Sequence, residues 1–120
     1  MFTRIANAPP NVLAIRAMGR ITDDDYRSML VPAIEQQIRT AGKIRLVYVI
    51  GAEFEGFDMM AAMDDALLGI HHWKDFEKVA VATDRDWIAN GVRMMGPLLP
   101  AKTRIFDVAQ MQDALDWAAA

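Results

Sequence analysis

The two histidines of the chain, His71 and His72, invite a test for metal chemistry because Asp64, Asp65 and Asp75 lie near them in the sequence. Imidazole and carboxylate groups are both ligands for divalent metals. Adjacent residues point about 100° apart on a helix and to opposite faces on a strand, so only a loop would bring both rings to one ion. Asp64 and Asp65 diverge for the same reason, which disfavours paired acid–base catalysis. We predict no metal site here, and a helix-end or solvent-facing position for both histidines.

Two further patterns are typical of enzymes, and both are incomplete. Gly51 and Gly56 have the spacing of a phosphate-binding loop, but Phe57 and Asp58 stand where a lysine and a hydroxyl residue should follow. Ser28, the only serine, falls inside a predicted helix and not on the strained turn that exposes a nucleophilic serine. The chain has no cysteine, which excludes disulfides and thiolate chemistry. We therefore predict no catalytic centre, no cofactor and no enzymatic activity.

The region around residues 85–104 is richer in apolar side chains than one buried helix face requires. These side chains are Trp87, Ile88, Val92, Met94, Met95, Leu98 and Leu99, and the cations beside them are Arg85, Arg93, Lys102 and Arg104. Rings and aliphatic chains of this kind enter a lipid headgroup region while neighbouring cations meet anionic lipid. The same side chains would also suit simple coverage of a sheet or a homodimer contact, so both alternatives stay open.

The elements that must position these residues follow from hydrophobic periodicity. Short apolar runs predict strands, and apolar spacing of three and four predicts helices that begin at capping residues. The predicted strands are Phe2–Ile5, Val12–Met18, Ile44–Ile50, Val79–Ala82 and Arg104–Phe106. The predicted helices run from a Thr22 cap to Gly42 with a bend at Pro32, over Phe57–Leu68, from a Thr83 or Asp84 cap to Met95, and after a capping box formed by Asp107 and Gln110. This order predicts an α/β fold with a mixed, largely parallel five-stranded sheet and four helices.

The composition indicates a single domain over residues 1–120. The chain is 53% hydrophobic and 24% charged, and its formal net charge of −3 disfavours nonspecific electrostatic binding to nucleic acid. Met1–Pro10 lacks the apolar core of a secretion signal, and no apolar run approaches the roughly 18 residues of a membrane-spanning helix. We expect a cytoplasmic location, with peripheral contact to the inner face of the membrane if the protein binds lipid.

Several segments, taken in order, resemble the SpoIIAA-like family, a branch of the STAS fold named after anti-sigma-factor antagonists. The segments are Gly19–Thr22, Gly42–Leu46, Phe54–Phe57, Asp65 with His71, Phe76–Val81 with Asp84 and Trp87, and Arg104–Phe106 with Ala114 and Trp117. The resemblance implies the five-stranded sheet and a non-enzymatic binding module. It does not extend to phosphorylation control, because the stretch after the central strand, Glu53–Asp58, contains no hydroxyl residue.

From this resemblance and the apolar third helix we predict a binding module for a lipid-like or small hydrophobic ligand, with reversible membrane association. The predicted ligand-binding residues are Phe57, Met60, Trp87, Ile88, Val92 and Met95. The predicted membrane contacts are Trp87, Met94, Leu98, Leu99 and Arg93. The alternative is a STAS-type regulatory domain that binds a protein partner through the surface from Glu55 to Asp58, without the phosphorylatable serine.

Overall fold

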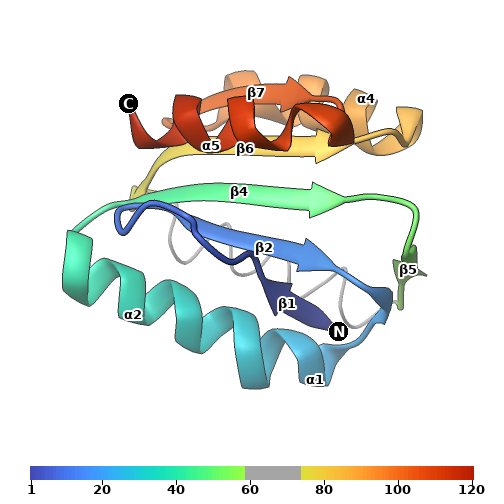
Figure 1. Ribbon diagram of the computed structural model, residues 1–120, viewed down its shortest axis with the longest axis horizontal. Coiled ribbons are helices and arrows are strands. Elements are labelled where there is room, and N and C mark those ends of the chain that lie inside the picture. Colours follow the sequence, from blue (N-terminus) through green and yellow to red (C-terminus); the bar gives the residue numbers. More distant parts are fainter. Residues whose placement is uncertain (59–73) are drawn as a thin grey trace.

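A computed structural model describes residues 1–58 and 74–120 of the chain. Its central sheet is built from β1 (Phe2–Arg4), β2 (Leu13–Ala17), β4 (Ile44–Ile50), β6 (Phe76–Thr83) and β7 (Lys102–Phe106). The strands lie in the order β1-β2-β4-β6-β7, as Figure 1 shows. β2, β4, β6 and β7 are parallel, and β1 pairs antiparallel with β2. The mixed, mostly parallel α/β sheet confirms the predicted fold class.

Side chains of the strands alternate between two apolar cores, one on each face of the sheet. On the first face Leu13, Tyr48 and Val81 belong to one buried cluster with residues of α2 (Val31–Ala41) and α4 (Asp86–Met95). On the second face Ala14, Val47 and Ala80 pack with residues of α5 (Met111–Ala119). Figure 1 shows α5 in front of the sheet and α4 behind it. Because both faces of the parallel strands are covered, β4 is apolar along almost its whole length.

The first helical segment begins at Thr22, as the sequence predicts. The Thr22 hydroxyl accepts a hydrogen bond from the Asp25 backbone N–H, and the Asp25 carboxylate accepts one from the Thr22 N–H, so α1 (Asp23–Asp25) starts with a complete capping box. A π-helical stretch, η1 (Tyr26–Leu30), follows and leads into α2. Pro32 lies in the first turn of α2, directly after these wider π turns, where its missing backbone N–H is tolerated.

A second, two-stranded parallel sheet pairs β3 (Gly19–Ile21) with β5 (Phe54–Phe57), and the sequence did not predict it. The prediction that Phe57 begins a helix is therefore wrong. Gly56, with a φ of +136°, lies within β5 and takes up a backbone conformation that disfavours other residues. Most of the predicted helix at 57–68 lies outside the described residues, including Met60, and so do His71 and His72.

The last two helices begin differently from one another. Arg85 is the N-cap of α4 and makes no side-chain cap, so the predicted Thr83 or Asp84 cap is wrong. Thr83 instead donates its hydroxyl to the Ile50 carbonyl, at 2.9 Å, and ties the end of β6 to β4. The predicted capping box of Asp107 and Gln110 is confirmed, at the start of the 3₁₀ turn η3 (Val108–Gln110) that leads into α5.

Candidate functional site

The predicted ligand-binding residues of α4 lie on two faces of that helix. Ile88 is 8% exposed and belongs to the first core, and Val92 is partly buried against the same core. Trp87 and Met95 are 60% and 57% exposed. Adjacent helical positions diverge by about 100°, which is why Trp87 points outward while Ile88 points inward. The structure thus assigns Ile88 and Val92 to sheet packing and leaves Trp87 and Met95 at the surface.

An exposed apolar stripe follows the outer face of α4 and continues into the 3₁₀ turn η2 (Gly96–Leu98). We call it the apolar ridge, and it consists of Trp87, Met94, Met95 and Leu98. Met94 and Leu98 are 78% and 63% exposed. The spacing of seven and four residues places Trp87, Met94 and Leu98 on one face. Met95 is exposed beside this face, at the end of α4. Large apolar side chains gathered at one exposed surface are a feature of interaction surfaces.

An aromatic cluster supports the Trp87 end of the ridge. The Phe54 ring lies 4.9 Å from the Phe57 ring and 6.4 Å from the Trp87 ring, measured between centroids. Arg85 donates a hydrogen bond from Nη2 to the Phe54 carbonyl at 2.8 Å. Phe54 is buried and therefore joins Phe57 to Trp87, although sequence reasoning did not select it. The signal that was available is the pair of aromatic residues three positions apart directly after the central strand.

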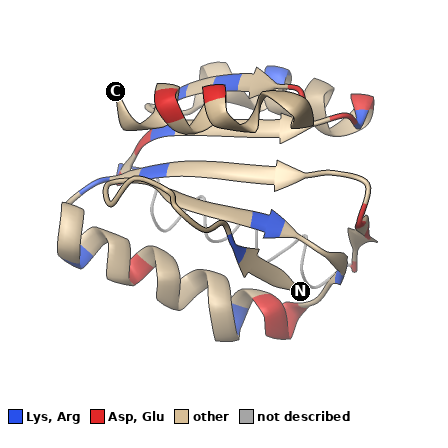
Figure 2. Cartoon of the chain, viewed as in Figure 1, with Lys and Arg blue, Asp and Glu red and all other residues tan. Residues whose placement is uncertain are grey.

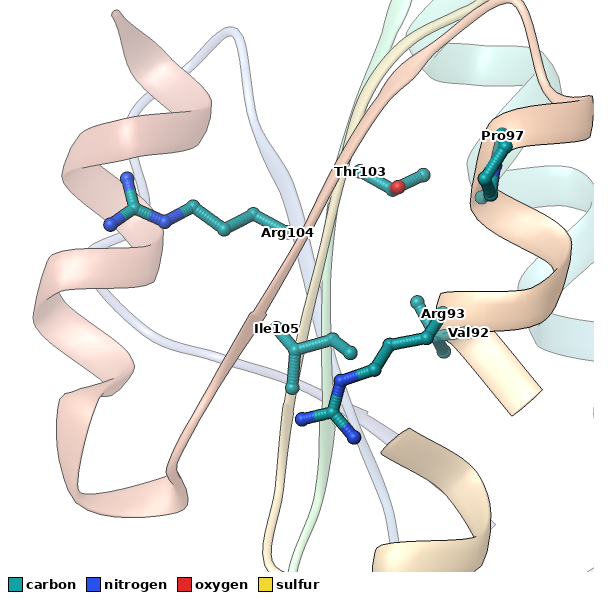
Figure 3. Close-up of a pocket in the computed structure, with 7 residues that line it drawn as sticks. Val92, Arg93, Pro97, Thr103, Arg104 and Ile105 are labelled. Carbon is teal, nitrogen blue, oxygen red and sulfur yellow. The ribbon is translucent and has the colours of Figure 1, made fainter. Parts of the chain in front are cut away.

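An open depression lies between the last turn of α4 and the edge strand β7. Its volume is about 560 Å³, and it is lined by Val92, Arg93, Gly96, Pro97, Thr103, Arg104 and Ile105. Figure 3 shows Arg93 on the α4 side and Arg104 directed away from α4. Arg104 stacks on Phe106, with Cζ 5.0 Å from the ring centroid. Arg93 is exposed and donates a hydrogen bond to Asn90 Oδ1 at 3.1 Å, so one cation stands beside the ridge.

Charged side chains are distributed unevenly along the strand direction. Beyond the carboxyl ends of the central strands, the loops, the short strand β5 and the helix starts carry Glu53, Glu55, Asp84, Asp86 and Asp107. At the amino ends of β4 and β6 Figure 2 shows lysine and arginine. The Trp87 end of the ridge therefore adjoins acidic groups. The Leu98 end faces the basic edge of the sheet.

The sheet order and the coverage of both faces define an α/β domain with a mixed, mostly parallel five-stranded sheet. A family model described as SpoIIAA-like matches residues 12–119, and the chain belongs to the SpoIIAA-like family. Among solved structures, the chain is similar to an uncharacterized DUF3478-family protein with a SpoIIAA-like fold from Shewanella loihica PV-4. The identity is 28%, the TM-score is 0.73, and the match covers 98% of this chain and 90% of that one. No curated protein matches the chain.

Proposed function

We propose that the chain is a non-enzymatic binding module that docks on a lipid surface through the apolar ridge. The observation that carries the proposal is the exposure of Trp87, Met94 and Leu98 on one face of α4 and η2, with Met95 exposed beside them. The ligand is then the lipid at the bilayer surface, and the contact is peripheral. No helix among residues 1–58 and 74–120 is long and apolar enough to cross a membrane.

The charge around the ridge favours an anionic bilayer and sets the orientation of docking. Arg93 and Lys102 are exposed near the Leu98 end, whereas Asp84 and Asp86 adjoin Trp87. Cations near an anionic bilayer surface contribute about 1 kcal/mol each, and acidic groups are repelled. We therefore place Leu98 and Met94 deepest in the headgroup region, and Trp87 shallowest.

The size of the apolar contribution is sufficient for reversible binding. Complete burial of a methionine or leucine side chain contributes about 1.5–3 kcal/mol, and the ridge residues have more than half of their surface still to bury. Two or three of them inserted together would offset much of the entropy cost of holding the protein at the surface. The expected behaviour is weak docking that strengthens with anionic lipid.

Vesicle flotation tests the proposal with a matched pair of variants. The test variant is Met94→Glu/Leu98→Glu, which places charge on the ridge. The control is Gln36→Glu/Ala109→Glu, which adds the same charge at exposed positions on α2 and η3. We expect wild type and control to float with vesicles that contain phosphatidylserine, and the test variant to remain unbound. Circular dichroism of all three proteins checks that each is folded.

Two results would overturn the proposal. One is a wild-type protein that binds neither zwitterionic nor anionic vesicles. The other is a Met94→Glu/Leu98→Glu variant that floats as well as the control. Either result would favour the alternative, a regulatory domain of the STAS type that recognises a protein partner, and would direct attention to the exposed acidic residues Glu53 and Glu55 at the carboxyl edge.

A further inference from the structure

All four lysines of the chain line one depression at the amino edge of the sheet. They are Lys43, Lys74, Lys78 and Lys102, and Arg45 joins them. The depression has a volume of about 510 Å³, and its remaining lining residues are Phe76, Glu77, Pro100 and Ala120. We call it the lysine depression. The lysines come from the loop before β4, the residues before β6, β6 itself and the first position of β7.

Part of this positive charge has a structural role at the end of α5. Lys78 donates a hydrogen bond to the Trp117 carbonyl and Arg45 donates one to the Ala118 carbonyl, each at 2.9 Å. Both carbonyls belong to the last turn of α5, where the helix dipole is negative and cations are stabilising. Arg45 also forms an ion pair with Glu77. Lys78 and Arg45 therefore have partners of their own.

The depression contains more positive charge than the carboxyl end of α5 neutralises. Five cationic side chains line the depression, against the carboxylate of Glu77 and the terminal carboxylate of Ala120, in a chain whose formal net charge is −3. A helix end presents only about half of an elementary charge, so α5 does not neutralise the remainder. Within the described part of the chain, the ammonium groups of Lys74 and Lys102 have neither a hydrogen bond nor an ion pair, and both residues are exposed.

We propose that the lysine depression binds a ligand that carries several phosphate groups. Ammonium groups are compact charges that suit phosphate oxygens approached from several directions, and they come here from separate elements that surround one hollow. Phe76 and Pro100 add an apolar part to the lining, against which the body of such a ligand can rest. The site is distinct from the apolar ridge, so a free polyphosphate would bind there without a membrane. Leu99 and Pro100 lie between the two in the sequence, so a phosphorylated lipid would place its headgroup in the depression while the ridge contacts the bilayer around it.

Isothermal titration calorimetry with inorganic tripolyphosphate tests the site itself. The test variant is Lys74→Gln/Lys102→Gln. The control, Arg4→Gln/Arg20→Gln, loses the same charge from exposed positions outside the depression. We expect saturable one-to-one binding by wild type, a loss of about tenfold or more in the test variant, and a change within about twofold in the control. Binding should weaken as sodium chloride is raised, since salt screens exposed charges.

A second arm distinguishes a free polyphosphate from a phosphorylated headgroup. Vesicles with phosphatidylinositol bisphosphate are compared with phosphatidylserine vesicles of equal total charge. If the protein prefers the phosphatidylinositol bisphosphate vesicles and Lys74→Gln/Lys102→Gln abolishes this preference, the ligand is a phosphorylated lipid headgroup. If the protein binds tripolyphosphate but does not prefer these vesicles, the ligand is a free polyphosphate. A neutral ridge variant, Met94→Ser/Leu98→Ser, should bind tripolyphosphate like wild type, which separates the failure of this site from the failure of membrane docking. The proposal is overturned if wild type does not bind tripolyphosphate saturably, or if the arginine control weakens binding as much as the lysine variant does.

Discussion

Replacing Ile88 and Met94 separately by alanine tests whether α4 has one face that folds the protein and another that is free to bind. The two residues lie on the same helix, six positions apart, and are 8% and 78% exposed. Truncating a buried isoleucine to alanine costs about 2–5 kcal/mol, because apolar area is lost and a cavity remains. Truncating a methionine that is mostly in solvent changes stability by about 0.5 kcal/mol or less.

Thermal unfolding followed by circular dichroism measures this difference directly. For a chain of this length, 1 kcal/mol corresponds to a shift of about 3–5 °C in Tm. Ile88→Ala should therefore lower Tm by roughly 6 °C or more, and Met94→Ala should leave it within about 2 °C. Urea titrations at 25 °C should give the same ranking with an unchanged m-value, which indicates that the unfolded states are equivalent.

In vesicle binding the two variants should rank in the opposite order, with Met94→Ala the more impaired. Met94→Ala removes apolar surface that is available for insertion, and about 0.8 kcal/mol per methylene predicts a loss of about tenfold in partitioning. Ile88→Ala, assayed well below its lowered Tm, should bind vesicles like wild type. The reasoning is refuted if Met94→Ala destabilises the fold as strongly as Ile88→Ala, because Met94 would then be packed and the ridge would not be a free surface.

Two further substitutions test local features of the fold. Gly96→Ala should destabilise the protein by about 1–3 kcal/mol in urea titrations, because the new Cβ would overlap Thr103 Oγ1. Combining it with Thr103→Ala should restore much of that loss, and strictly additive effects would contradict the overlap. Burial raises the pKa of Asp25, but hydrogen bonds from Thr22 and the nearby N-terminal amine outweigh it and hold the pKa below its ordinary 3.8. The charged carboxylate therefore stabilises the fold above about pH 4, and the stability lead of wild type over Asp25→Asn should shrink as pH falls below 4; a lead that is constant down to pH 2 would contradict this.

Local patterns in the sequence were sufficient for several elements. The Ile44–Ile50 strand was predicted with its observed bounds because a strand covered on both faces needs an almost continuous apolar run. The capping boxes that begin at Thr22 and Asp107 were found because each joins residues three positions apart. Interactions between residues so close in the sequence depend little on the rest of the chain.

The pairing of β3 with β5 could not be found in the same way. It joins residues about 35 positions apart, and a hydrogen bond of 2.7 Å from the Gly19 N–H to the Glu53 carbonyl precedes it. The run Phe54–Phe57 is too short for hydrophobic periodicity to distinguish a strand from the first turn of a helix, because its only large apolar side chains are at its two ends. The contact of Phe54 with Trp87 depends on this pairing and was missed with it.

The amino-acid sequence by itself determined the α/β class, the most buried strand and the excess of apolar side chains on the third predicted helix. Only the tertiary structure decided which of those side chains stay exposed, since Ile88 and Trp87 are adjacent in sequence and differ only in the face that meets the sheet. It also brought together four lysines spread over 60 residues, because parallel strands align their amino ends at one edge whatever their separation along the chain.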